Sequence, residues 1–194
     1  MQKKAGPRRL AAEALGYITA CVKPGITTNE IDRLIHDYHI NVQGGYPAPL
    51  NYGNPPYPKY CCTSVNHVIC HGIPDDKPLK NGDIVNIDVT IKKDGFHGDS
   101  SRMFAVGEIS PQAKRLIEVT HASMMAGIEA VKPGATLGDI GYACQQVAEN
   151  AGYSVVQEFC GHGIGRGFHE EPQVLHYGRK GQGMELKPGM IFTV

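Results

Sequence analysis

Residues 84–104 read IVNIDVTIKKDGFHGDSSRMF, and this stretch decides which kind of fold the chain can adopt. Apolar and polar residues alternate on both sides of Asp94-Gly95, a dipeptide that favours a two-residue turn between antiparallel strands. We therefore predict a β-hairpin with strands over residues 83–91 and 96–106. Asp88 and Asp99 stand inside these strands, where aspartate is disfavoured, so both need an explanation.

The position of the turn decides how the two aspartates lie. A turn centred on Lys93-Asp94 places them directly opposite, with Cβ atoms about 5 Å apart. A turn at Asp94-Gly95 makes them diagonal neighbours on the same face, and only a three-residue loop would separate them. At about 5 Å two carboxylates repel by about 3 kcal/mol at an effective dielectric constant of about 20. A shared proton or a bound cation would offset this repulsion; the alternative is two solvated aspartates on an exposed face.

Three pairs of similar segments follow one another in the same order along the chain. Such internal self-similarity indicates two related halves, which we place at residues 6–107 and 108–194 of a single domain, 1–194. The pairs are VKPGITTNEI (22–31) with VKPGATLGDI (131–140), CHGI (70–73) with CGHGI (160–164), and LKNGDIVNI (79–87) with LKPGMIFTV (186–194).

Each half starts with two helices and continues with strands. The first helix ends at Lys-Pro-Gly, and the second begins at a capping box, Thr27-x-x-Glu30 or Thr136-x-x-Asp139. We expect further strands over residues 62–69, over 153–159 and from Met190 onward, and a loop over 44–59. This order predicts an α+β fold with an antiparallel sheet and helices on one face. The last strand lacks the hairpin that follows its counterpart, so we expect residues 190–194 to form an unprotected or unpaired edge.

Charge and composition exclude several classes of protein. Of 194 residues, 19 are basic and 19 acidic, which argues against a nucleic-acid-binding protein. No apolar run reaches the length of a membrane span, and the N-terminal residues do not resemble a signal peptide. We therefore expect a cytoplasmic protein that binds no membrane, with its six cysteines as free thiols.

Histidines beside glycines mark the second candidate region for chemistry. The chain has nine histidines and 24 glycines, and His71, His97, His162 and His169 each lie within three residues of a glycine. The segment around His162 fits neither the G-x-G-x-x-G fingerprint nor the HExxH metal motif. Together with the two aspartates, these histidines favour a metal site.

Four motifs resemble those of type I methionine aminopeptidases. They are CHGIP (70–74), NGDIVNIDVT (81–90), GFHGDSSRMF (95–104) and GHGIGRGFHEEP (161–172). The resemblance covers nearly the whole chain and implies the pita-bread fold of two pseudo-symmetric halves. It also implies a site with two divalent metal ions (Co, Mn, Fe or Zn) that activates water to remove the initiator methionine from nascent polypeptides. It further implies a monomer, with the ribosome as a candidate partner.

The same resemblance assigns roles residue by residue. Asp88, Asp99 and His162 match metal ligands, with Asp99 bridging the two ions. His71 matches the catalytic histidine near the scissile amide, and His169 matches a histidine that hydrogen-bonds the substrate. Three further residues match positions that form the walls of the methionine pocket: Phe168, Tyr57 and Cys62.

The family pattern continues with two glutamate ligands beyond the segment that matches residues 192–194. We therefore expect the second half to be incomplete and the 194-residue polypeptide to have little or no aminopeptidase activity, because three ligands are too few for two cations. The alternative function is a catalytically inactive pita-bread fragment or a binding module.

Two other enzyme classes remain to be distinguished. His97, Asp99 and His162 match the two-histidine-one-carboxylate pattern of non-haem iron oxygenases, but this interpretation leaves Asp88 and His71 without a role. Proline-specific peptidases share the pita-bread fold, but their usual histidine motif is spaced differently.

Overall fold

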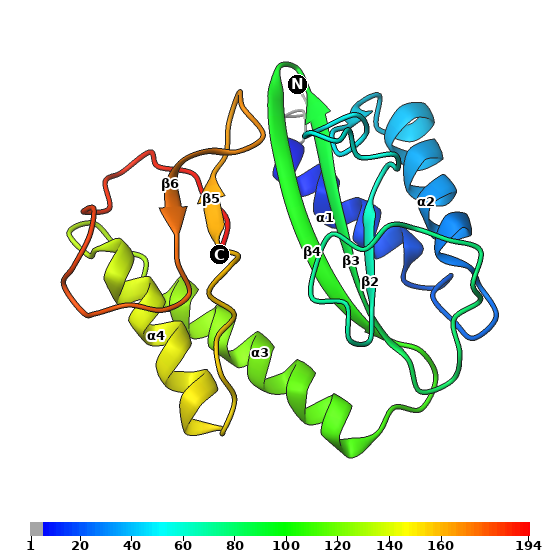
Figure 1. The fold of residues 1–194 in the computed structure, drawn as a ribbon. Coiled ribbons are helices and arrows are strands. Elements are labelled where there is room, and N and C mark those ends of the chain that lie inside the picture. The colour runs from blue at the N-terminus through cyan, green and yellow to red at the C-terminus, as the bar shows by residue number, and fades with distance from the viewer. Residues whose placement is uncertain (1–5) are drawn as a thin grey trace. The chain divides into compact units, whose positions relative to one another are not determined.

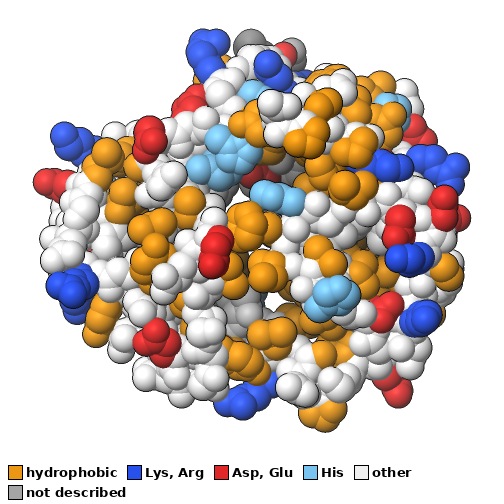
Figure 2. All heavy atoms as spheres, in the orientation of Figure 1, with side chains coloured by type: hydrophobic (Ala, Val, Ile, Leu, Met, Phe, Trp, Pro, Cys, Tyr) orange, Lys and Arg blue, Asp and Glu red, His pale blue; other side chains and the backbone are white. Residues whose placement is uncertain are grey.

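The computed structural model describes residues 6–194, which form two compact units, one ending at Ser110 and the other comprising Pro111–Val194 (Figure 1). On the face shown in Figure 2, acidic and basic side chains are scattered among apolar ones, without a large patch of one charge. Among the described helices, none combines the length and the apolar character needed to cross a membrane. The predicted division into pseudo-repeat halves at 107/108 falls within three residues of the boundary between the units.

The first unit begins with two amphipathic helices. Helix α1 (Pro7–Ile18) has proline at its start, where the ring does not interrupt a hydrogen bond. Helix α2 (Thr28–Asp37) begins at the predicted capping box, in which Thr27 and Glu30 accept hydrogen bonds from each other's backbone N–H groups. A π-helical turn, η1 (Tyr38–Val42), continues α2 and carries the fully buried side chain of His39.

The predicted hairpin forms the centre of the first sheet. Strand β3 (Ile84–Lys93) pairs with β4 (Phe96–Ala105), and Asp94 and Gly95 make the turn with φ values of 51° and 81°. Two shorter strands, β1 (Tyr46–Pro47) and β2 (Cys62–Val65), pair with the other edge of β3. All four strands are antiparallel.

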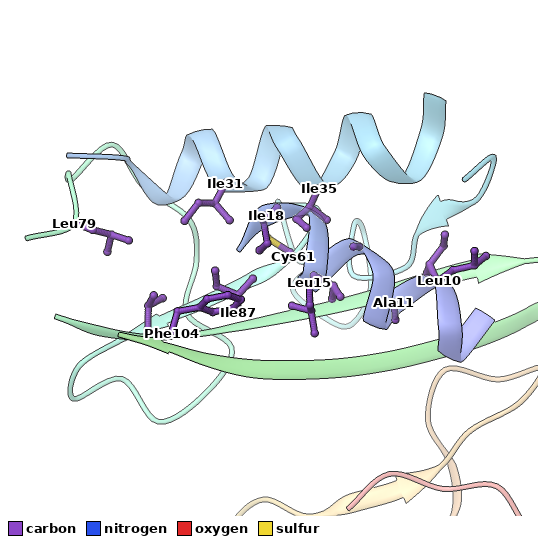
Figure 3. Close-up of a cluster of buried hydrophobic side chains, with 14 of the residues drawn as sticks. Leu10, Ala11, Leu15, Ile18, Ile31, Ile35, Cys61, Leu79, Ile87 and Phe104 are labelled. Atoms are coloured by element: carbon purple, nitrogen blue, oxygen red, sulfur yellow. The ribbon is translucent and has the colours of Figure 1, made fainter. Parts of the chain in front are cut away.

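Both helices cover one face of this sheet, as predicted (Figure 3). Apolar side chains from α1, α2 and β3 meet there and exclude water; they include Leu15, Ile18, Ile31, Ile35 and Ile87. Helix α1 approaches β4 so closely at Gly98 that a Cβ atom there would lie 2.1 Å from the backbone carbon of Pro7. Glycine is therefore required beside Asp99.

The second unit pairs two helices with a small sheet. Helices α3 (Pro111–Glu129) and α4 (Leu137–Asn150) approach closely at Gly127, where a Cβ atom would lie 2.4 Å from the Cys144 sulfur. Strand β5 (Gly161–Gly163) pairs with β6 (Glu170–Val174). The core of this unit contains Ile140, Cys144 and Val174.

The structure corrects three expectations about strands. The predicted strand over 153–159 is absent, and the backbone there is irregular. The strand predicted over 62–69 ends at Val65, because Asn66 takes a left-handed conformation with φ of 54° and turns the chain. Residues 190–194 are not unpaired: Phe192 bridges Gly163, and the Thr193 N–H donates to the His162 carbonyl at 2.9 Å.

Candidate metal and catalytic site

Asp88 and Asp99 lie as diagonal neighbours on one face of the β3–β4 hairpin. Asp88 is opposite Ser101, and Asp99 is opposite Thr90, as the turn at Asp94-Gly95 predicts. The Thr90 hydroxyl donates to Asp99 Oδ1 at 2.7 Å and orients that carboxylate. The hairpin therefore brings two carboxylates together, each on its own strand.

The surroundings of Asp88 disfavour a negative charge. Burial raises the pKa of its carboxyl well above the usual range, and the charge of Asp99 and a hydrogen bond between the two carboxyls raise it further. Such a pair is stable when it shares a proton or when a cation neutralises it. Because carboxylate oxygens suit divalent ions such as Mn²⁺, Co²⁺ and Fe²⁺, the pair fits the metal ions that the resemblance implies.

Cys62 lies directly opposite Asp88 on β2. Burial raises the pKa of its thiol to about 12, and the nearby charges of Asp88 and Asp99 act in the same direction. A thiol that stays protonated at neutral pH is a poor nucleophile but a suitable apolar contact. These properties of the Cys62 side chain fit a residue that lines the wall of the methionine pocket, which is the role that the resemblance implies.

Tyr57 connects two segments next to these carboxylates. Its hydroxyl donates to the Gly72 carbonyl at 2.8 Å and lies 3.1 Å from the Cys61 carbonyl. Burial raises the pKa of this phenol, so it remains a hydrogen-bond donor. Gly72 directly follows His71, which takes a left-handed backbone conformation with φ of 55°. For a residue other than glycine this costs about 1–2 kcal/mol, and such strain is concentrated at functional sites.

Helix α2 anchors the segments that carry Tyr57 and His71, and its role was missed in the sequence. The buried Asp32 carboxylate accepts hydrogen bonds from the backbone N–H groups of Tyr60 and Cys61, at 2.8 and 3.0 Å. Burial raises the pKa of Asp32, and these two hydrogen bonds oppose the shift. The sequence feature that could have indicated this anchoring role is an aspartate directly after Ile31, which is buried.

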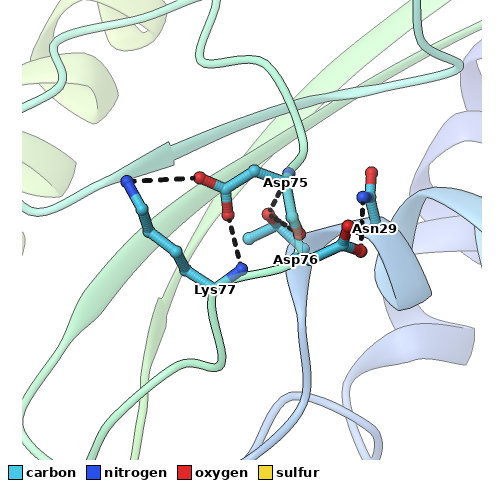
Figure 4. A network of polar contacts seen from close by, with 5 residues as sticks. Asn29, Asp75, Asp76 and Lys77 are labelled. Carbon is cyan, nitrogen blue, oxygen red and sulfur yellow. Dashed lines mark hydrogen bonds and ion pairs between the residues drawn. The ribbon is translucent and has the colours of Figure 1, made fainter.

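The first turn of α2 holds the segment after His71 (Figure 4). Asn29 donates from its side chain to Asp76 at 2.7 Å and from its backbone to the Asp75 carbonyl at 2.9 Å. The Thr28 hydroxyl accepts from the Asp75 N–H at 2.8 Å, and Asp75 in turn lies 3.6 Å from the Lys77 ammonium. One helix therefore fixes both loops of the candidate site in the first unit.

The second unit presents His162, Phe168 and His169 as one cluster. The rings of His162 and His169 lie 4.2 Å apart, and those of Phe168 and His169 lie 4.3 Å apart and are stacked. His162 Nδ1 lies 2.9 Å from the Gly163 carbonyl. Because a carbonyl only accepts, Nδ1 is the donor in this contact, and in the neutral imidazole the lone pair is then on Nε2, as in most metal-ligating histidines.

The predicted site residues are thus divided between the two units. Asp88, Asp99, Cys62, Tyr57 and His71 belong to the first, and His162, Phe168 and His169 belong to the second. Within residues 6–194 no three His, Cys, Asp or Glu side chains form a group that could hold a metal ion. Ligation by Asp88, Asp99 and His162 together therefore stays a prediction.

Comparison with known proteins relates these features to a family. The model of metallopeptidase family M24 matches residues 5–194. Methionine aminopeptidase from Rickettsia prowazekii (strain Madrid E) is 59% identical over 186 residues, which are 96% of this chain and 71% of that protein. Methionine aminopeptidase from Escherichia coli (strain K12) is 56% identical over 187 residues, 96% of this chain and 70% of that protein. The chain belongs to metallopeptidase family M24.

Solved structures support the same assignment. The crystal structure of the Rickettsia prowazekii methionine aminopeptidase has a TM-score of 0.91 and 59% identity, covering 94% of this chain and 73% of that one. Methionine aminopeptidase from Thermotoga maritima has a TM-score of 0.90 and 32% identity, covering 98% and 79%. Prolidase from Pyrococcus furiosus, at 22% identity and a TM-score of 0.81, shares the fold and covers 96% and 52%.

These comparisons confirm the predicted resemblance, the α+β pita-bread fold and the assignment to the metallopeptidases, which are hydrolases. Membership of a metallopeptidase family implies divalent metal ions as cofactors. The chain spans about 70% of the length of the relatives it matches.

Proposed function

We propose that this M24 chain removes N-terminal methionine from polypeptides. The observation that carries the proposal is the pair of carboxylates on adjacent strands, in which Asp88 is destabilised as an isolated anion. The identity of 59% to a methionine aminopeptidase over 96% of the chain favours methionine over proline-directed cleavage.

In this proposal Asp88, Asp99 and His162 hold the two divalent ions. The ions would supply an activated water and polarise the scissile carbonyl. Asp99 is oriented for this role by the Thr90 hydroxyl, and His162 by the bond from Nδ1 to the Gly163 carbonyl. Both side chains therefore need little reorganisation on binding a cation.

His71 and His169 act on the substrate in the proposed site. His71 hydrogen-bonds the scissile amide, and His169 hydrogen-bonds the substrate during the tetrahedral step. Tyr57, Cys62 and Phe168 line the pocket for the methionine side chain, since sulfur makes favourable contacts with aromatic rings. The proposal also includes nascent polypeptides as substrates, contact with the ribosome, a cytoplasmic location and a monomeric state.

Release of methionine from Met-Ala-Ser tests the proposal. We expect release that depends on added Co²⁺, Mn²⁺, Fe²⁺ or Zn²⁺ and falls at least about 100-fold in Asp99→Asn, since that variant loses a charged ligand. Asp94→Asn, an exposed aspartate in the turn of the same hairpin, is the matched control and should keep the wild-type rate. A rate insensitive to Asp99→Asn, or faster cleavage of Ala-Pro than of Met-Ala-Ser, would overturn the proposal.

The same assay decides between the proposed function and the low activity expected from the sequence. Turnover by the 194-residue polypeptide, with two tightly bound cations in a calorimetric titration, would support the proposed function and contradict the expectation of low activity. Tight cation binding without turnover would overturn the proposed function and support the binding-module alternative.

A further inference from the structure

The backbone at His71 is held in an unusual conformation. The structure describes four non-glycine residues with positive φ: Asn51, Asn66, His71 and Asp94. Asn and Asp tolerate this region because their short side chains hydrogen-bond locally. His71 is the one histidine among these four residues, and the groups that fix its neighbouring peptide units help to keep it in this conformation.

Those groups converge on Gly72, the next residue. The Gly72 N–H donates to the Ser64 hydroxyl at 3.1 Å, and the Gly72 carbonyl accepts from the Thr63 N–H and the Tyr57 hydroxyl, both at 2.8 Å. A Cβ atom on Gly72 would lie 2.2 Å from the Thr63 carbonyl oxygen, so the two segments are in direct contact. Both polar groups of the Gly72 backbone are therefore fixed.

Of these bonds, only the one to Ser64 holds the peptide unit that joins His71 to Gly72. Its donor, the Gly72 N–H, belongs to that unit, whereas the Gly72 carbonyl belongs to the next one. Ser64 is 4% exposed and lies on β2, whose backbone is itself fixed by pairing with β3. A short side chain on a paired strand has little freedom, so its hydroxyl is a rigid acceptor. Rotating the peptide that follows His71 would break this bond.

We propose that Ser64 is a positioning residue for His71: its hydroxyl, by accepting the Gly72 N–H, keeps His71 in the left-handed conformation from which it acts on substrate. The catalytic consequence rests on the proposed function, in which His71 hydrogen-bonds the scissile amide. The structural part, that Ser64 holds the 71–72 peptide, does not depend on that function.

A matched control is available one residue away. Thr63 lies on the same strand and is 4% exposed, like Ser64, but its hydroxyl has no hydrogen-bond partner within residues 6–194. Thr63→Val removes a hydroxyl without removing a bond, whereas Ser64→Ala removes the bond to Gly72. Ser64→Thr keeps a hydroxyl at the same position and serves as the conservative rescue.

Amide hydrogen exchange tests the structural part without any assay of activity. We expect Gly72 to exchange at least about tenfold faster in Ser64→Ala than in wild type, while amides of β3 and β4 are unchanged, because only a local bond is lost. Thr63→Val should leave Gly72 exchange unchanged, and Ser64→Thr should restore it. Equal Gly72 exchange in wild type and Ser64→Ala would overturn the proposal, whatever the enzyme does.

Steady-state kinetics with Met-Ala-Ser test the catalytic consequence. We expect kcat to fall about 10–100-fold in Ser64→Ala with KM within about threefold, because a misplaced catalytic group affects the transition state more than substrate binding. Ser64→Thr and Thr63→Val should keep kcat near wild type. Faster Gly72 exchange with unchanged kcat would overturn the positioning role. Absence of methionine release from the wild type would overturn the proposed function, while the exchange data would still decide whether Ser64 holds the peptide.

Discussion

Asp88 is an aspartate in a place where an isolated carboxylate is unfavourable. It lies across the hairpin from Asp99, beside the protonated thiol of Cys62, and burial raises its pKa more than any other cause does. In the metal-free protein this raised pKa means that the folded state binds a proton more readily than the unfolded state. Asp88 therefore makes the metal-free fold less stable as the pH rises toward neutrality.

Replacing Asp88 by Asn should stabilise the metal-free protein and abolish its cation binding. We expect the free energy of unfolding in EDTA at pH 7 to rise by about 1–3 kcal/mol, because the Asn side chain removes both the burial of a carboxylate and its repulsion by Asp99. Urea unfolding measures the stability, and calorimetry with Co²⁺ measures the binding. Asp94→Asn should change neither. A metal-free Asp88→Asn protein that is less stable than wild type would show that the carboxylate makes favourable contacts instead.

Individual residues could be predicted where a local pattern fixed them. Two of the three turns that the sequence left open place Asp88 and Asp99 on one face, and the structure has one of these two, the turn at Asp94-Gly95. Asp32 and Ser64 could not be predicted in this way, because each acts on a segment brought near by tertiary structure.

Among the secondary-structure elements, helix α1 contains a residue that does not favour a helix. Gly16 lies in the last turns of this helix on its exposed side, and a Cβ atom there would contact nothing within 4 Å. Glycine in a helix costs conformational entropy that alanine does not. The position is thus free of the packing restraint that requires glycine at 72 and 98.

Gly16→Ala should stabilise the protein by about 0.5–1 kcal/mol, the difference in helix propensity between the two residues. Gly72→Ala should destabilise it by about 2–4 kcal/mol, because the new methyl group would overlap the Thr63 carbonyl. Thermal unfolding of both variants beside wild type measures the two effects. Equal shifts of the melting temperature in the two variants would contradict the close approach at Gly72.

Elements with strong end signals were predicted correctly, and those without them were not. Both capping boxes form, with Thr136 and Asp139 repeating the arrangement of Thr27 and Glu30. The apolar residues between 153 and 159 suggested a strand, but Val156 and Phe159 remain exposed, so no packed sheet supports one. Strand formation there depends on partners that a local pattern does not specify.

In the molecule as a whole, burial disfavours the charged form of a histidine in each of the two units. Burial lowers the pKa of His39 in the first unit and of His176 in the second. The Gln43 amide nitrogen donates to the Leu10 carbonyl at 2.8 Å, so its oxygen accepts from His39 Nδ1 at 2.7 Å. Nε2 of His39 has no partner within residues 6–194, so a proton added there would be buried without an acceptor.

These two histidines should therefore lower the stability of the fold as the pH falls below about 6.5, the usual histidine pKa, whereas Asp88 in the metal-free protein acts in the opposite direction. Below that pH the unfolded chain binds protons that the folded protein does not, whereas above it these histidines contribute no pH dependence. The free energy of unfolding from urea titrations between pH 5 and 8 measures this effect. His39→Gln keeps a donor for Gln43 and should flatten the acid decline, and the exposed His121→Gln should not. An unchanged decline in His39→Gln would exclude His39 as a source.

The contact between Pro7 and Gly98 has a consequence for anyone who transplants this hairpin into another protein. The start of α1 lies against the backbone of β4 immediately before Asp99, in a gap too narrow for any side chain. A graft of residues 84–105 without α1 would expose the backbone of β4 to solvent next to the carboxylates. The hairpin should therefore be transferred together with α1, and these two elements should be exchanged between homologues only as a unit.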